Sequence, residues 1–332
     1  MRMKLLVLGI FLSLTVVSAM AQPPAVKPAC DRACLENYID RYLDAVLAKD
    51  VSPKLFAREV KFTENGIQLP LGKEGLWYGM SGKGTYKFYV PDIETQQVAF
   101  IGTVQEGGTS GGAKPAAPTM IAVAIRLKIV NSLITEVEQL VIRPEQSLTA
   151  AKPAASSSGF PPTGEAVEKM GAPHPMFAEV IPEDKRHTRE DLVRIGNYYF
   201  DGLQRNDGKG YYPFTDDAVR FENGINACGL DKEGNLIPGA CKNQFYKGLE
   251  GIVSRIRDRR FVAVDRERGI AFAFGFFDHE QINWTWQLAE LFKIEGENIR
   301  RIEAVFHRCP YGLNSGWSTY EQGMSEERQS IR

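Results

Sequence analysis

The sequence predicts an α+β protein made of two tandem copies of one small domain, in each of which an N-terminal helix covers a curved antiparallel sheet. Three observations support this fold class: an internal repeat, an amphipathic helical pattern at the start of each copy, and a closing series of long strand patterns. The chain has 332 residues, of which 43% are hydrophobic, and this is enough apolar material for two separate cores.

Three sequence blocks occur twice in the same order and at nearly constant offset. The corresponding stretches are 42–50 and 199–207, 60–67 and 219–225, and 127–138 and 292–303. Such a repeat is typical of a duplicated structural unit. Unrelated domains with short look-alike segments are the alternative, and three matches in one order make that alternative a poor explanation.

The chain begins with a pattern typical of a secretory signal peptide. Arg2 and Lys4 form a positive start, residues 5–17 are apolar, and residues 19–21 (AMA) form a small-x-small cleavage site. The apolar run is too short for a comfortable membrane span. We therefore expect residues 1–21 to be removed and the protein to be secreted or periplasmic, without membrane contact after cleavage; an uncleaved anchor is the alternative.

Composition divides the rest of the chain into segments. We expect a first domain over 30–145, a Pro/Ala/Ser-rich linker over 146–186, a second domain over 187–317 and a polar tail over 318–332. A second Gly- and Pro-rich stretch, residues 106–118, interrupts the first copy. Because apolar runs flank it on both sides, we interpret it as a long flexible hairpin loop.

Each copy opens with one helical pattern. Residues 31–49 place apolar side chains at helical spacing, and Asp31 can cap the first turn. In the second copy Thr188 begins a capping pattern ahead of a similar stripe. Tyr42 and Tyr199 occupy matching positions on the two stripes, where packing in the core is the usual role.

The later part of each copy alternates apolar and polar residues as antiparallel strands do. A turn at residues 131–132 and another at 296–298 separate two pairs of strands in hairpins. Long strands with one apolar face need a helix to cover it. The predicted strands are 98–104, 120–130 and 133–142 in the first copy, and 261–264, 270–277, 284–294 and 299–308 in the second.

Five cysteines lie beyond the predicted cleavage site, and export would permit disulfides. Cys228 and Cys241 bracket a Gly- and Pro-containing loop that a bridge would staple, so we favour this pair. Cys30 could pair with Cys34, or either of them with Cys309, and the sequence does not choose. A metal site is disfavoured because the spacings contain no CxxC pair and no neighbouring histidine.

Several motifs resemble known families. The Phe-x-Glu-Asn-Gly motif after the helical start, together with the closing long hairpin, is similar to the SnoaL-like, nuclear transport factor two-like superfamily. Ketosteroid isomerases and small polyketide cyclases share its cone-shaped fold, so the resemblance implies two cone-shaped domains. It says little about chemistry, because the fold hosts enzymes, binding modules and assembly factors. The motifs that more narrowly resemble an uncharacterised tandem family of exported bacterial and fungal proteins are residues 30–35, 62–66, 75–77, 257–261 and 276–279.

A cone-shaped domain implies an apolar interior, so the candidates are polar residues on apolar strands. Asp278 and His279 end such a strand. His279 could act as a general base that Asp278 orients, or the pair could simply mark the strand end. Glu303 and His307 share one face of the last strand by alternation. They form a plausible acid–base pair if that face lines the cone, and have no such role if it faces solvent.

An arginine-rich run over residues 254–260 offers further candidates. Alternation would place Arg255, Arg257 and Arg259 on one side, where they could bind a carboxylate, sulfate or phenolate. A solvated strand edge that discourages strand pairing is the plainer interpretation. Asp258 would then point the other way and could be an inward-facing acid.

Two pairs of polar residues repeat between the copies. Glu64 and Glu222 precede Asn-Gly turns, which favours a structural role, and the alternative is a carboxylate at each cavity. Tyr42 and Tyr199 could, in a cone-shaped domain, donate a hydrogen bond to a bound carbonyl instead of only packing.

Known cofactor signatures are absent from the sequence: it has no GxGxxG, Walker, GxSxG or zinc motif. We expect no cofactor, and a formal net charge of −1 gives no reason to expect a nucleic-acid partner. We therefore expect an exported, cofactor-independent lyase, isomerase or hydrolase that acts by acid–base chemistry on a small, partly aromatic molecule. The alternatives are a non-catalytic small-molecule-binding module and an interaction domain whose sheet faces pair the copies or form a homodimer.

Overall fold

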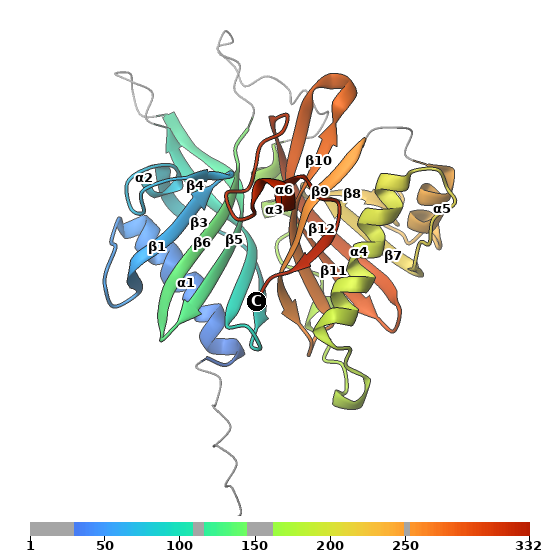
Figure 1. Cartoon of the computed structure of the whole chain (residues 1–332), viewed down its shortest axis with the longest axis horizontal. Helices are drawn as coiled ribbons and strands as arrows, with labels where there is room; N and C mark the ends of the chain where they lie inside the picture. The colour runs from blue at the N-terminus through green and yellow to red at the C-terminus, as the bar shows by residue number, and fades with distance from the viewer. Residues whose placement is uncertain (1–29, 109–115, 145–161, 249–252) are drawn as a thin grey trace, which may run out of the picture.

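The computed structural model describes residues 30–108, 116–144, 162–248 and 253–332. The predicted signal peptide lies outside these ranges, as do residues 109–115 of the predicted hairpin loop and residues 146–161 of the predicted linker. The described chain is a mixed α/β protein with two β-sheets and few helices (Figure 1). None of the helices in the described ranges is long and apolar enough to cross a membrane.

The first half builds a six-stranded sheet in the order β2-β1-β6-β5-β4-β3. Neighbouring strands are antiparallel except β1 and β6, which run parallel, so the sheet is mainly rather than purely antiparallel. The elements are α1 (Arg32–Ala48), β1 (Phe56–Glu64), β2 (Ile67–Gln68), α2 (Leu76–Gly79), β3 (Met80–Asp92), β4 (Gln97–Gly108), β5 (Ala116–Val130) and β6 (Leu133–Ile142).

The second half builds a seven-stranded sheet in the order β13-β9-β10-β11-β12-β7-β8. Without β13 this is the strand order of the first sheet, so the repeat in the sequence is also a repeat in topology. The elements are α4 (Arg189–Arg205), β7 (Phe214–Glu222), β8 (Ile225–Cys228), α5 (Ala240–Lys247), β9 (Arg255–Asp265), β10 (Ile270–His279), η3 (Glu280–Ile282), β11 (Trp284–Glu295), β12 (Asn298–Pro310), α6 (Tyr320–Met324) and β13 (Arg328–Ser330).

One long helix covers the outer face of each sheet (Figure 1). Helix α1 packs on β3 and β4, and α4 packs on β9, β10 and β11. Both predicted caps are confirmed, because Asp31 accepts a hydrogen bond from the backbone of Cys34 and Thr188 accepts one from Asp191. The buried stripes of these helices carry Tyr42 and Tyr199, and both side chains are almost completely buried.

Two disulfides join cysteines close in the sequence. The predicted bridge between Cys228 and Cys241 is confirmed. Cys30 pairs with Cys34, the first of the options that the sequence left open, and Cys309 is a buried free thiol.

The inner faces of the two sheets pack against each other. Strand β3 contacts β9, and β6 contacts β12, so residues far apart in the sequence share one apolar core. The contacts are reciprocal: the Tyr86 hydroxyl on β3 donates to Glu303 on β12 at 2.6 Å, and Arg260 on β9 binds Glu138 on β6. Glu138 and Glu303 are equivalent positions of the repeat, so the halves are related as the subunits of a two-fold dimer would be.

The segment predicted as a linker takes part in this shared core. It forms α3 (Thr163–Lys169) and the short helices η1 (Pro175–Ala178) and η2 (Glu183–Lys185). Val167 and Phe177 are buried between the sheets. The second part of the predicted linker is therefore an ordered segment, in which isolated apolar residues in a polar context find partners from both halves.

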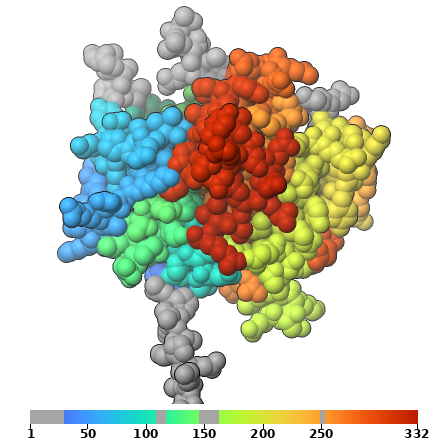
Figure 2. Space-filling view, in the orientation of Figure 1, coloured from blue at the N-terminus to red at the C-terminus, as the bar shows by residue number. Residues whose placement is uncertain are grey.

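The predicted polar tail is likewise an ordered element. It runs across the line where the two halves meet (Figure 2), and its strand β13 pairs in parallel with β9. Ser318 of the tail donates to Asp258 in the second half at 2.5 Å, and Trp317, the residue just before the tail, donates from Nε1 to Thr63 in the first half at 2.7 Å. The polar composition of the tail agrees with this position, because the tail contacts the second half through strand pairing and side-chain hydrogen bonds.

Candidate functional site

Both faces of the second sheet are covered, so each candidate residue has to be assigned to one face. We call the face under α4 the helix face and the face toward the first half the seam face. On β10, Phe277 belongs to the apolar core of the helix face, whereas Phe272 and Phe274 belong to the shared core on the seam face. Alternation therefore sends the neighbours Asp278 and His279 to opposite faces.

Asp278 lies on the seam face and is held by arginines. Arg255 and Arg257 donate to its Oδ2 at 2.6 and 2.9 Å, and Thr285 donates to its Oδ1 at 2.8 Å. Burial alone would raise the pKa of Asp278, but these hydrogen bonds outweigh it and hold the pKa below its ordinary value. The expectation that Asp278 orients His279 is wrong, because its carboxylate is engaged on the other side of the sheet.

His279 lies on the helix face, 3% exposed, between two tryptophans of β11. Its ring stacks on Trp284 with centroids 4.2 Å apart and meets Trp286 edge-on at 4.6 Å. The Nδ1 atom lies 3.0 Å from the carbonyl oxygen of Phe277. Burial, partly opposed by this hydrogen bond, lowers the pKa of His279. Because a carbonyl only accepts, the neutral ring carries its proton on Nδ1 and leaves a lone pair on Nε2.

The Nε2 atom of His279 is buried, and within the described ranges no polar atom is in hydrogen-bonding position to it. Such an unpaired buried acceptor costs about 1–3 kcal/mol, which packing alone does not explain. The ring of His279 forms one wall of a cavity of about 250 Å³. The other lining residues come from the position before β9, from η3 and from the start of β11: Ser254, Glu280, Gln281, Ile282, Trp284 and Trp286.

The equivalent place in the first half holds ion pairs. Strand register makes Glu106 the counterpart of His279, and Arg143 the counterpart of Arg308. Arg143 binds Glu106 at 2.6 and 2.7 Å and Glu64 at 2.8 Å. In the second half Arg308 instead lies over the Trp284 ring, 4.9 Å from its centre. The same fold position is thus an ion-pair cluster in one half and an aromatic cavity in the other.

A second group of polar residues lies deeper on the helix face. Arg220 donates to the hydroxyl of Tyr199 at 3.0 Å and to Gln244 at 2.9 Å, and its Nε lies 3.4 Å from Glu222. Glu290 on β11, 1% exposed, lies near Tyr199 and Arg220. Burial first, and the charge of Glu222 second, raise the pKa of Glu290 well above its ordinary value, so its carboxyl group favours the protonated form.

The first half keeps a simpler version of this group. The hydroxyl of Tyr42 donates to Gln139 at 2.7 Å, and Gln139 donates to Glu64 at 2.8 Å. Glu64 also accepts from the backbone of Leu76 at the start of α2. The Asn-Gly turns after Glu64 and Glu222 have positive φ at both residues in each half, as the structural interpretation of these motifs requires.

Glu303 and His307 share a face as predicted, but it is the seam face and not the helix face. Glu303 accepts from Tyr86 of the first half. His307 lies 3.2 Å from Gln287, and burial together with Arg143 lowers the pKa of His307 to about 4. Glu303 therefore joins the two halves through Tyr86, and His307 is hydrogen-bonded to Gln287 within its own sheet, so the two do not form an acid–base pair under α4.

The arginine-rich run does not alternate as expected, because Asp258 has a φ of 49° and the register of β9 shifts beside it. Arg257 stays on the seam face, whereas Arg259 reaches α4, where it binds Asp201. Asp258 itself contacts Ser318 and Arg260 on the seam face. Two expectations are therefore wrong: the three arginines do not share one side, and Asp258 is not an acid of the cone interior.

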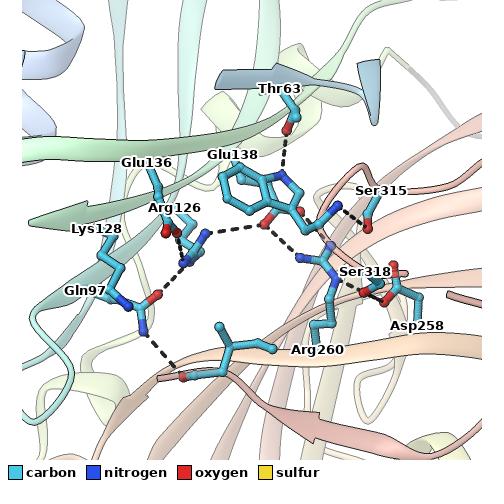
Figure 3. A network of polar contacts seen from close by, with 12 residues as sticks. Thr63, Gln97, Arg126, Lys128, Glu136, Glu138, Asp258, Arg260, Ser315 and Ser318 are labelled. Atoms are coloured by element: carbon cyan, nitrogen blue, oxygen red, sulfur yellow. Dashed lines mark hydrogen bonds and ion pairs between the residues drawn. The ribbon is translucent and has the colours of Figure 1, made fainter. Parts of the chain in front are cut away.

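The seam face instead holds a network of charges (Figure 3). Glu138 lies between Arg126 and Arg260, and Arg126 also binds Glu136 at 2.5 Å and Gln97 at 2.6 Å. Figure 3 shows that the network continues through Arg260 to the second half of the chain. These groups neutralise one another across the seam, so the network is a structural joint.

Sequence reasoning missed Trp284, Trp286, Arg220 and Glu290. A signal for three of them was present, because residues 284, 286, 288, 290, 292 and 294 alternate onto one face that is otherwise apolar. Two tryptophans near the end of that face, and one acid in its middle, are unusual enough to mark it. In the described ranges no three His, Cys, Asp or Glu side chains are grouped as metal ligands would be.

Comparison with known proteins adds limited information. A family model for a domain of unknown function, DUF8021, matches residues 185–306, which falls within the second half. No curated protein matches the chain. Among solved structures, AclR, a candidate hydroxylase from Streptomyces galilaeus, is similar over 42% of this chain and 95% of its own, at 15% identity and a TM-score of 0.29. A likeness of that size carries no argument about the chemistry of this chain.

Proposed function

We propose that the second half is a cofactor-independent acid–base enzyme that binds a small molecule between His279 and the two tryptophans of β11. The lone pair on Nε2 of His279 carries this proposal. Nε2 is buried beside a cavity, and the described chain offers it no hydrogen-bond partner. The hydrogen bond from Nδ1 to the carbonyl of Phe277 favours the tautomer in which Nε2 is unprotonated. Those are the properties of a general base that awaits a substrate proton.

A single general base, His279, favours a reaction in which one proton is moved from one atom of the substrate to another. A proton would pass from the substrate to Nε2, and the imidazolium would keep its Nδ1 proton on the carbonyl of Phe277. The same proton would then return to another atom of the substrate, which makes the net reaction an isomerisation without an oxidant or cofactor. A hydrolase or lyase would need a second acid at the cavity, and Glu280 is the carboxylate that lines it.

A non-catalytic binding module is the second candidate, and one observation favours it. The Nε2 atom has no exposed surface although the cavity is open, so a ligand that only stacks on the indoles would not reach the base. Catalysis requires a side chain of the cavity to move, and Trp284, stacked on the imidazole ring and only half-buried, is placed to do so.

Export belongs to the same proposal. The pattern over residues 1–21 is that of a signal peptide, and the two disulfides are compatible with an oxidising compartment. A homodimer is not part of the proposal, because the inner sheet faces already cover each other within one chain.

The test starts from ligands that co-purify with the natively produced protein, identified by mass spectrometry. The released ligand is incubated with enzyme in D₂O, and deuterium uptake or a mass-neutral isomer is followed. We expect His279→Gln to lower this rate by about 10²–10⁴-fold, the usual contribution of a general base. His307→Gln is the matched control on the seam face and should leave the rate unchanged.

Two results would change the conclusion. Wild-type protein that binds the ligand tightly but exchanges no hydrogen is a binding module. Equal exchange in the wild type and in His279→Gln removes His279 from the chemistry altogether, provided that circular dichroism shows both proteins folded.

A further inference from the structure

We infer that the ligand of this cavity is a flat, one- or two-ring aromatic molecule that carries a hydroxyl group, with the hydroxyl donated to Nε2 of His279. The inference rests on the proposed function, because it names the substrate class of the same cavity. It is argued from the walls of the cavity, its size and the hydrogen-bonding character of its buried polar atom.

The walls are aromatic rings. His279, Trp284 and Trp286 all line the cavity, and the centroids of the two indoles are 5.1 Å apart. Rings of this kind bind other flat rings by stacked or edge-on contact. The volume of about 250 Å³ is below the range of drug-sized cavities, so it suits one or two fused rings rather than a steroid-like skeleton.

The buried polar atom of the cavity is an acceptor. Nε2 of His279 has a lone pair, because the ring proton is on Nδ1, which donates a hydrogen bond to the carbonyl of Phe277. Ser254 does not compete for the ligand, since its hydroxyl donates to the carbonyl of Asp278 and accepts from the backbone of Glu280. Because Nε2 is covered, a ligand reaches it only when Trp284, which stacks on the imidazole ring, moves aside. Such a ligand satisfies the site only if it brings a hydrogen-bond donor to Nε2.

The charge at the rim selects against an anionic ligand. Glu280 lines the cavity and is exposed, so its carboxylate would repel a ligand carboxylate or sulfate. Arg308 lies over Trp284 but does not line the cavity. A neutral phenolic or naphtholic hydroxyl is the donor that agrees with both the aromatic walls and the acidic rim.

The test compares 2-naphthol with 2-methoxynaphthalene, which has the same rings without the donor. Binding is followed by quenching of tryptophan fluorescence in the full chain. We expect 2-naphthol to bind at least about fivefold more tightly, because the methoxy compound leaves Nε2 unpaired. In His279→Phe, which keeps an aromatic wall without the acceptor, this preference should disappear.

The outcomes separate the inference from the proposed function. Equal binding of both probes to the wild type overturns the hydroxyl requirement and leaves the cavity as a binding site. A preference that persists in His279→Phe also overturns it, because the acceptor would then be another group. Binding of neither probe overturns the proposed site as well as the inference.

A second measurement covers the case in which His279→Phe does not fold. Wild-type protein labelled with ¹⁵N in its four histidines reports each ring nitrogen separately by NMR. The inference expects one ring with a protonated Nδ1 whose Nε2 resonance moves on addition of 2-naphthol and stays in place with 2-methoxynaphthalene. No such movement at saturating 2-naphthol overturns the inference.

Discussion

The charge network on the seam face supports a quantitative prediction for Glu138→Leu. Glu138 is 4% exposed and accepts two hydrogen bonds from Arg260, at 2.6 and 2.9 Å, while Nη1 of Arg126 lies 3.8 Å from its Oε2. Leucine would remove the carboxylate and leave two buried guanidinium groups without it. Loss of one member of a buried pair costs about 3–5 kcal/mol. Because Asp258 still faces Arg260, at 3.2 Å, we expect the lower end, about 3 kcal/mol.

Urea unfolding followed by circular dichroism and tryptophan fluorescence measures this cost. Glu136→Leu is the matched control, since Glu136 binds the same Arg126 but its side chain is 29% exposed, and we expect a loss below about 1 kcal/mol. The double variant with Arg260→Met should cost at least about 1.5 kcal/mol less than the sum of the two single variants. Strict additivity, or a loss below 1 kcal/mol for Glu138→Leu, would refute the reasoning.

Three further predictions concern stability. Replacing Cys228 and Cys241 together by serine should lower the free energy of unfolding by about 3 kcal/mol, because their bridge closes a loop with a sequence separation of 13; an unchanged urea midpoint would contradict this. Glu290→Gln should stabilise the protein at pH 7, because the raised pKa of Glu290 makes its contribution to stability present at acidic pH and lost as the pH rises, at about 1.4 kcal/mol per pKa unit. Thermal melts at pH 4 and pH 8 should accordingly differ less in this variant than in the wild type. The pKa of about 4 for His307 means that, from about pH 6.5 downward, the unfolded state takes up a proton that the folded state does not. Stability should therefore fall toward pH 4 by up to about 1.4 kcal/mol per pH unit from this group, and a slope that stays the same in His307→Gln would argue against it.

The duplicated fold could be predicted because local signals agreed with one another. Asp31 and Thr188 cap helices where the patterns began, and the Asn-Gly turns after Glu64 and Glu222 have the positive φ that these residues tolerate. The seven strands with predicted ranges start or end within a few residues of β4, β5, β6, β9, β10, β11 and β12, whereas the remaining strands had no predicted range. These features depend on neighbours along the chain, which a single sequence displays.

Face assignment was the part that the sequence could not settle. Because α4 covers one side of the second sheet and the first half covers the other, both faces of β10 are apolar and alternation alone cannot say which one surrounds a ligand. Glu303 and His307 were consequently placed in a cavity, whereas Glu303 binds Tyr86 of the first half and His307 binds Gln287 on the seam face. The turn of β9 at Asp258 was a further obstacle, since a positive φ at an aspartate inside a strand has no sequence signal.

The candidate site was visible only in part. His279 was named for its neighbour Asp278, but its contacts are with Trp284 and Trp286, two positions apart on the next strand. Recognising the cavity required the pairing of β10 with β11, which brings His279 opposite Trp284. The ion-pair cluster around Arg143, which distinguishes the first half, also depends on contacts between strands.

The covalent connection of the two halves has a consequence for evolution and for use at low concentration. Two separate chains with such an interface would dissociate on dilution, and each would expose the inner face of its sheet to water. A shared polypeptide holds the halves together at any concentration, without the translational entropy that a dimer loses on association. The two halves can then evolve independently. The first half can carry ion pairs where the second half has its cavity, and the residues of that cavity can change without a matching change in the first half.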